Sequence, residues 1–349
     1  MPYTTSFADE ISNQLYSKKF GLPDTSLQSG NTDFFHFSPQ YRAAPAAGDN
    51  PAVSNMVAHS ACMTLIRNIR YVRLGTRDLD AATRFATRIV GLQEAGRVGT
   101  AGAVYFRSDT RHHTLVYFEG DPTEQIIAFE VEDTAALKAA ARNFEALGLA
   151  PRRGSRDECA LRNVAAMIAL RDPSGNFLEL VVPAKDTDAA FVAPRAAGIT
   201  GFAHVALRST DPVRDEAFWT GVLGARVSDR IGNAPLLRFD EMHHRVALLP
   251  ARQPGIHHIA HQVGSIDDVM RAWYFLGENG ARVVLGPSRE PTSTAIYLHF
   301  EGPDGMLFEY LAGAKTISND ATHRPRHFPI AARSFCMWGG KPDLSELGR

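Results

Sequence analysis

Histidine is the residue type that stands out in this sequence for the chemistry it can do. The chain contains thirteen histidines, and six of them form adjacent pairs at 112–113, 243–244 and 257–258. Imidazole binds metal ions and transfers protons near neutral pH. Glu309 lies within the apolar run Met306–Leu311, where an unpaired buried carboxylate would be costly and therefore has to bind a partner. Two imidazoles, His204 and His258, together with Glu309 are typical of a non-haem Fe(II) site for oxygen chemistry, with Mn(II) as a substitute.

An internal repeat predicts the elements that would position these residues. Four segments recur at a spacing of 130 to 133 residues: 71–74 as 204–207, 112–116 as 243–247, 127–131 as 259–263, and 172–179 as 302–309. Such a repeat predicts two copies of one domain, over residues 66–184 and 199–315.

Each predicted copy contains two β-α-β-β-β modules. Amphipathic patterns predict helices over 78–90, 134–147, 211–222 and 265–279, with short strands between them. Helices of this length cover one side of a sheet, so the other side is free to curve around a cavity. The predicted fold class is α+β.

The two copies differ at the proposed metal site. The second copy has His204 where the first has Tyr71, and His258 where the first has Ile126, whereas Glu309 matches a glutamate at 179. The triad is therefore expected in the second copy only. Strand alternation places His257 and His261 on the opposite face, and a shift of one residue would exchange these assignments.

Two further segments flank the repeat. Residues 1–65 are rich in polar and small residues without periodicity, which predicts an irregular extension. Residues 316–349 form a C-terminal tail whose segment 322–327 carries two arginines and two histidines, and we expect it to be solvated or packed over the cavity entrance.

The overall composition excludes several classes of protein. The 37 Lys+Arg and 38 Asp+Glu residues nearly cancel, so neither nucleic-acid nor membrane-surface binding is indicated. The three cysteines are widely spaced, which predicts neither a disulfide framework nor a cysteine zinc site. No long apolar run and no signal segment is evident, so a cytoplasmic location is expected.

The repeat, the three candidate ligands and the ending Pro303-Asp304-Gly305 followed by Glu309 together resemble the type I extradiol ring-cleavage dioxygenases of the vicinal oxygen chelate superfamily. The resemblance covers about residues 66–315. It implies Fe(II) bound in the C-terminal copy by His204, His258 and Glu309, with a small aromatic diol and O2 as substrates. It also implies that His244 handles protons and that the chain forms a homo-oligomer.

The sequence departs from the family pattern at two positions. His299 stands where the family usually has a tyrosine, and Arg289 and Glu290 stand where it often has a histidine. An imidazole at 299 could still donate a hydrogen bond to a substrate oxygen, but its pKa of about 6.5, against about 10 for a phenol, changes the protonation chemistry. Arg289 and Glu290 are expected to contact substrate near the cavity mouth, and Tyr297, on the face of His299, either supplies a phenol or packs.

Two other functions remain open at this point. One is a metal-dependent isomerase or transferase of the same superfamily, although such relatives commonly take ligands from both copies. The other is a non-enzymatic ligand-binding protein of the bleomycin-resistance kind, although such proteins usually do without the metal triad.

Overall fold

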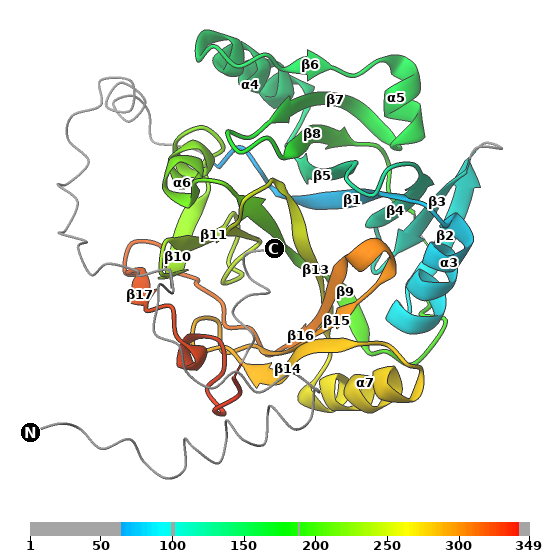
Figure 1. The fold of residues 1–349 in the computed structure, drawn as a ribbon. Helices are drawn as coiled ribbons and strands as arrows, with labels where there is room; N and C mark the ends of the chain where they lie inside the picture. The colour runs from blue at the N-terminus through cyan, green and yellow to red at the C-terminus, as the bar shows by residue number, and fades with distance from the viewer. Residues whose placement is uncertain (1–63, 99–101, 188, 342–349) are drawn as a thin grey trace, which may run out of the picture. The chain divides into compact units, whose positions relative to one another are not determined.

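The computed structural model describes residues 64–98, 102–187 and 189–341. The N-terminal extension predicted over residues 1–65 lies almost entirely outside the described residues, as do the last eight residues of the tail. Within the described ranges the chain forms two mixed β-sheets, which follow one another in sequence (Figure 1).

The first sheet has eight strands in the order β2-β3-β4-β1-β5-β8-β7-β6. Its two central strands, β1 and β5, are antiparallel, and each pairs in parallel with the last strand of one module, β4 or β8. The strands are β1 (Asn68–Thr76), β2 (Gln93–Val98), β3 (Ala103–Arg107), β4 (Leu115–Glu119), β5 (Gln125–Glu130), β6 (Arg152–Arg153), β7 (Val164–Arg171) and β8 (Phe177–Pro183).

The second sheet repeats this arrangement and adds one strand, in the order β14-β15-β16-β13-β9-β12-β11-β10-β17. Here β9 and β13 are the central antiparallel pair, flanked in parallel by β12 and β16. The strands are β9 (Ile199–Ser209), β10 (Arg226–Ile231), β11 (Ala234–Arg238), β12 (Val246–Pro250), β13 (Gly255–Val263), β14 (Val283–Arg289), β15 (Ile296–Glu301), β16 (Leu307–Ala312) and β17 (Arg326–Phe328).

One main helix follows the first strand of each module, so the predicted α+β fold of tandem β-α-β-β-β modules is confirmed. Each of these helices begins at a side chain that accepts a hydrogen bond from a backbone N–H of the first turn, which satisfies one of the free donors there. The four caps are Asp78, Asp133, Asp211 and Ser265. The helices are α3 (Leu79–Arg84) continued by η1 (Phe85–Val90), α4 (Thr134–Ala146), α5 (Arg156–Leu161), α6 (Pro212–Gly221), α7 (Ile266–Glu278), η2 (Pro303–Gly305) and η3 (Ala332–Ser334).

The first of the predicted helices, over 78–90, is not α-helical throughout. Its second half, η1, is a π-helix. The carbonyl groups of Ile89 and Val90 accept hydrogen bonds from the Tyr310 hydroxyl, and Ile89 also accepts from Arg195. Contacts with residues that follow the first copy in sequence therefore hold the end of this helix. The local sequence pattern gives no information on these contacts.

Polar contacts join the two copies at the ends of their opening strands. Thr76 of β1 donates a hydrogen bond to Asp304 in the final turn of the second copy, at 2.7 Å. In the reciprocal place, the backbone N–H of Thr210, just after β9, donates to Ser174 in the final turn of the first copy, at 2.8 Å. The same turns that the repeat aligns thus contact the opposite copy.

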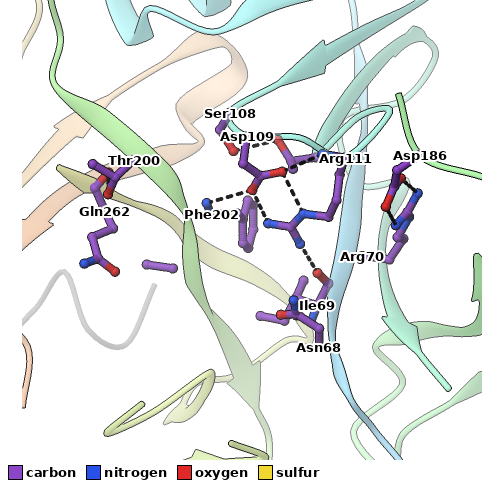
Figure 2. Close-up of polar contacts among 12 residues, drawn as sticks. Asn68, Ile69, Arg70, Ser108, Asp109, Arg111, Asp186, Thr200, Phe202 and Gln262 are labelled. Carbon is purple, nitrogen blue, oxygen red and sulfur yellow. Dashed lines mark hydrogen bonds and ion pairs between the residues drawn. The ribbon is translucent and has the colours of Figure 1, made fainter. Parts of the chain in front are cut away.

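A third junction lies between the β3–β4 loop and β9 and is seen in Figure 2. Asp109 forms an ion pair with Arg111 and accepts a hydrogen bond from the backbone N–H of Phe202 at 3.4 Å. The Arg111 guanidinium also donates to the carbonyl of Ile69. This places a partly buried charge pair of the first copy against the start of the second.

The C-terminal tail contains regular structure that the sequence did not predict. Strand β17 pairs in parallel with β10 and extends the second sheet by one strand (Figure 1). Arg326 of β17 forms an ion pair with the buried Asp229 of β10, and Cys336 is buried. The described part of the tail is therefore packed on the second copy. Within the described ranges no helix is both long and apolar enough to cross a membrane.

Candidate metal centre

Three adjacent strands of the second sheet bring His204, His258 and Glu309 together. His204 lies on β9, His258 on β13 and Glu309 on β16, and Ala260 on the middle strand is the register partner of both His204 and Glu309. The methyl side chain of Ala260 leaves space between its two larger neighbours, while His258 reaches the same space from two residues away along the strand. All three side chains are buried.

The spacing of the three donor atoms fits one metal ion. Nε2 of His204 lies 3.1 Å from Nε2 of His258, and Oε2 of Glu309 lies 3.2 Å and 3.3 Å from these two nitrogens. Ligands about 2.2 Å from one divalent ion and at right angles to each other lie about 3.1 Å apart. The nearly equilateral triangle therefore corresponds to one face of an octahedron and leaves the opposite face for exogenous ligands.

The protonation states of Glu309 and His258 favour metal binding. Burial by itself raises the pKa of the Glu309 carboxyl, but the adjacent imidazoles of His204 and His299 hold this pKa well below its ordinary value. Burial lowers the pKa of His258 well below its ordinary value, and the neighbouring His299 adds to the shift. An anionic carboxylate and a neutral imidazole are the forms that bind a divalent ion.

His299 contacts the carboxylate of the triad. It lies on β15 as the register partner of Glu309, and its Nε2 is 3.0 Å from Oε2 of Glu309. Its ring centroid is also 4.5 Å from that of His258. A hydrogen bond from His299 to a substrate oxygen stays a prediction; in the structure its Nε2 contacts Glu309, because residues 299 and 309 are directly opposite each other on neighbouring antiparallel strands.

Glu290 adds a second carboxylate near the triad. It directly follows β14, is partly buried, and accepts a hydrogen bond from the Ser293 hydroxyl at 2.5 Å. Burial raises the pKa of Glu290, and the negative charge of Glu309 raises it further. The site therefore presents a carboxyl group of unusual basicity at the position where the sequence departs from the family pattern.

The polar groups of Arg289 and Tyr297 make their hydrogen bonds away from the triad. Arg289 is exposed and donates from Nε to the Thr294 carbonyl at 3.3 Å. Tyr297 is buried beside His299, but its hydroxyl donates to the carbonyl of Phe335 in the tail at 2.9 Å. The Tyr297 hydroxyl is thus engaged in holding the tail.

His244 lies beside the triad as expected. Its ring centroid is 4.3 Å from that of His204, and its ring is buried. Nδ1 of His244 is 3.1 Å from Nδ1 of its neighbour His243, whose Nε2 is 2.9 Å from Oδ2 of Asp229. Asp229 and His243 were not predicted as site residues, although a carboxylate within the alternating strand 226–231 was a signal for a buried partner.

The other histidines of the second copy lie off the triad. His257 is buried, and its Nδ1 is 2.9 Å from Nδ1 of His258. His261 stacks on the ring of Phe308 and meets the ring of Phe202 edge-on. Since Phe308 alternates with Glu309, His261 lies on the face opposite the triad, as strand alternation predicted.

In the first copy, protein side chains contact Glu179 directly at the position equivalent to the metal site. The Tyr71 hydroxyl donates to Oε2 of Glu179 at 2.7 Å, and Nε of Arg162 donates to Oε1 of the same carboxylate at 2.8 Å. The register partner of Ala128 on β8 is Glu179, just as Glu309 is the partner of Ala260, so the repeat alignment holds in space. A guanidinium therefore balances the buried carboxylate in this copy.

Comparisons with known proteins show the family of this chain. The model of the Glyoxalase/Bleomycin resistance protein/Dioxygenase superfamily matches residues 68–180 and 201–310. The chain belongs to the type I extradiol dioxygenases of this superfamily. It is 30% identical to an iron-dependent extradiol dioxygenase of Rhodococcus jostii (strain RHA1) over 58% of this chain and 75% of the relative.

Two further relatives cover more of the chain. A biphenyl-2,3-diol 1,2-dioxygenase of Pseudomonas sp. (strain KKS102) is 30% identical over 79% of this chain and 97% of its own length. A Mn(II)-bound glyoxalase from Novosphingobium aromaticivorans has a similar structure, with a TM-score of 0.71 and 25% identity over 81% of this chain and 94% of the other. The similarity thus extends over both copies, and the similar proteins include one named as iron-dependent and one bound to Mn(II).

Proposed function

We propose that this protein is an Fe(II)-dependent extradiol dioxygenase that opens the ring of a catechol-type aromatic substrate with O2. The observation that carries the proposal is the facial triangle of His204, His258 and Glu309, with donor atoms 3.1 to 3.3 Å apart. The iron-dependent relative from Rhodococcus supports Fe(II), and the Mn(II)-bound relative makes Mn(II) the alternative. The relative named for biphenyl-2,3-diol supports a small aromatic diol as substrate.

The roles of the residues follow from their positions. His204, His258 and Glu309 would hold the metal. Fe(II), if bound there, would supply Lewis-acid and redox chemistry for the reaction of the diol with O2. The reaction adds one oxygen atom to each of two neighbouring ring carbons, one of which carries a hydroxyl, and breaks the bond between them.

The remaining site residues would act on the substrate and its protons. His244, next to His204, is the proposed base that accepts a hydroxyl proton of the diol and returns it after ring opening. His299 would keep the Glu309 carboxylate oriented and steer the substrate hydroxyl. The partly buried Glu290 would accept a hydrogen bond from a substrate substituent near the cavity mouth. Arg289 and Tyr297 stay predictions as substrate contacts, as does the homo-oligomer.

The test is anaerobic loading with Fe(II) followed by measurement of oxygen uptake with a panel of catechols. We expect uptake matched one-to-one by loss of the aromatic absorbance of the diol. Glu309→Gln should abolish uptake, and Glu179→Gln, the same change at the equivalent position of the first copy, is the matched control that should retain it. Uptake that survives Glu309→Gln and His258→Ala would refute the metal assignment.

The same experiment separates the alternative functions. Tight metal binding without oxygen uptake on any diol would refute the dioxygenase and favour a metal-dependent isomerase or transferase. Binding of aromatic ligands that does not depend on metal would instead favour a sequestering protein.

A further inference from the structure

We propose that Asp229 and His243 are positioning residues that fix the tautomer of His244, so that the unprotonated Nε2 of His244 faces the triad. The three side chains form a continuous hydrogen-bonded row from the interior of the sheet to the metal centre. The inference deepens the proposed function, because it assigns the groups that prepare the base for the substrate proton.

The row begins at Asp229 on β10, which is completely buried. Its carboxylate receives Nη2 of Arg326 at 2.6 Å and the backbone N–H of Arg326 at 2.7 Å, and Nζ of Lys315 lies at 3.7 Å. Burial by itself raises the pKa of the Asp229 carboxyl, but the hydrogen bonds from His243 and Arg326 hold this pKa below its ordinary value. The carboxylate is therefore ionised and can only accept hydrogen bonds.

An ionised Asp229 determines which nitrogen of His243 carries the proton. Nε2 of His243 is 2.9 Å from Oδ2 of Asp229, and since the carboxylate has no proton to give, this nitrogen must be the donor. Burial lowers the pKa of His243 even though Asp229 acts in the opposite direction, so the ring is neutral near pH 7. A neutral imidazole has one N–H only, which leaves Nδ1 of His243 as an acceptor.

The acceptor nitrogen of His243 determines the tautomer of His244 in turn. The two Nδ1 atoms are 3.1 Å apart, so Nδ1 of His244 has to donate. A neutral imidazole has one N–H only, so a neutral His244 with its proton on Nδ1 has none on Nε2. Within the described residues His244 makes no other hydrogen bond. Its Nε2 therefore keeps a lone pair beside His204, as a base for a hydroxyl group requires.

The first copy contains the same histidine pair without the carboxylate. Nδ1 of His112 is 3.0 Å from Nδ1 of His113, which stacks on Tyr71. At the position equivalent to Asp229 the first copy has Gly96, since Gly96 pairs with Tyr105 just as Asp229 pairs with Leu236, each directly after a register shift. The paired imidazoles are thus common to both copies, but the group that orients them occurs only beside the triad.

Without the Asp229 carboxylate, the tautomers of His243 and His244 would no longer be fixed. With an amide at 229, Nε2 of His243 could accept as well as donate, and both imidazoles could then reverse their tautomers. His244 would present Nε2–H to the substrate and could not take its proton. General base catalysis is worth about 10² to 10⁴ in kcat, and loss of the carboxylate that orients a catalytic histidine costs about 10⁴ in serine proteases.

The direct test is ¹⁵N NMR of the full chain labelled with ¹⁵N-histidine and loaded with Zn(II) as a diamagnetic probe. Long-range ¹⁵N–¹H correlations distinguish the two neutral tautomers, and His243→Phe and His244→Gln assign the signals. We expect the proton on Nε2 of His243 and on Nδ1 of His244, with a change of tautomer in Asp229→Asn. A wild-type His244 that carries its proton on Nε2 would overturn the inference.

The kinetic test uses the Fe(II)-loaded enzyme and a double-mutant cycle. Asp229→Asn should lower kcat by about 100-fold or more with KM within about threefold and iron content unchanged, because it acts on the base alone. In a His244→Ala background the same change should cost less than about threefold, since the group through which it acts is gone. Equal losses in both backgrounds would mean a merely structural role and would refute the proposal.

Two further variants keep the test decisive. If Asp229→Asn does not fold, His243→Phe uncouples His244 from Asp229 while it leaves the Arg326 ion pair in place, and it should show the same loss of kcat. His112→Gln, in the histidine pair of the first copy, is the matched control and should leave kcat unchanged. If the wild type cleaves no diol, the proposed function fails, while the NMR measurement still decides the tautomer.

Discussion

A buried histidine away from the metal centre makes the stability of this protein depend on pH. His261 is completely buried, and neither of its ring nitrogens has a hydrogen-bond partner among the described residues. Its ring lies between the rings of Phe308 and Phe202. Burial lowers the pKa of His261 to about 4, with Asp109 acting in the opposite direction and Arg111 and His204 adding to the decrease.

The sign and size of the effect follow from the difference between folded and unfolded states. An unfolded histidine has a pKa of about 6.5. Above that pH neither state binds the proton, so the full stability is present. As the pH falls from 6.5 toward 4 only the unfolded state gains the proton, and stability is lost at about 1.4 kcal/mol per pH unit. His261 therefore accounts for a loss of about 2 kcal/mol at pH 5 and about 3 kcal/mol at pH 4.

The assay is urea unfolding of the metal-free protein at pH 8 and pH 5, comparing wild type with His261→Leu. Between these two pH values, the variant should lose about 2 kcal/mol less free energy of unfolding than the wild type. At pH 8 it should be at least as stable, because leucine removes two unpaired polar atoms from an aromatic environment. His327→Gln, at an exposed position, is the control for removal of one imidazole. Equal losses in wild type and His261→Leu would refute the reasoning.

Three further predictions concern the contacts between copies, the first copy and the metal. Tyr310→Phe should lower the free energy of unfolding by about 1 to 3 kcal/mol in urea titrations, because its buried hydroxyl contacts Arg195 and the Val90 carbonyl, each at 2.7 Å; an unchanged midpoint would contradict this. Arg162→Met should cost about 3 to 5 kcal/mol in the same assay by leaving Glu179 without a cation, and Glu179→Gln in that background should restore part of it. Anaerobic Fe(II) at about 100 times its dissociation constant should stabilise the fold by about 2.7 kcal/mol in thermal unfolding, and no such shift should occur with Glu309→Gln.

The repeat made most of the fold and the triad predictable from the sequence. The alignment of Tyr71 with His204 and of Glu179 with Glu309 corresponds in the structure to matching register partners on matching strands. Strand alternation then assigned His258 to the triad face and His261 to the other. These predictions succeeded because both patterns are local consequences of strand geometry.

The remaining contacts depend on which strands become neighbours, which a single sequence does not reveal. His299 was expected near the triad, but its contact with Glu309 follows from the pairing of β15 with β16. Asp229 was not predicted because its partners are distant in sequence. His243 lies in the segment 242–245, and Arg326 lies on the tail strand β17, 97 residues away. Arg289 adjoins Glu290 but is exposed, since neighbouring residues of an extended chain face opposite sides.

Both copies bury a glutamate whose negative charge needs a positive partner, and the two copies balance this charge differently. The difference is an argument for a metal cation in the second copy. Each copy buries a glutamate at the same position of its last strand, and a buried carboxylate needs a positive partner. In the first copy Arg162 supplies that charge to Glu179. Among the described residues of the second copy, the ion-pair partners of Glu309 are imidazoles alone, and the pKa of His258 is held well below its ordinary value. The second copy thus has no guanidinium at Glu309, and a divalent ion bound by the triad would supply the positive charge that Arg162 supplies in the first.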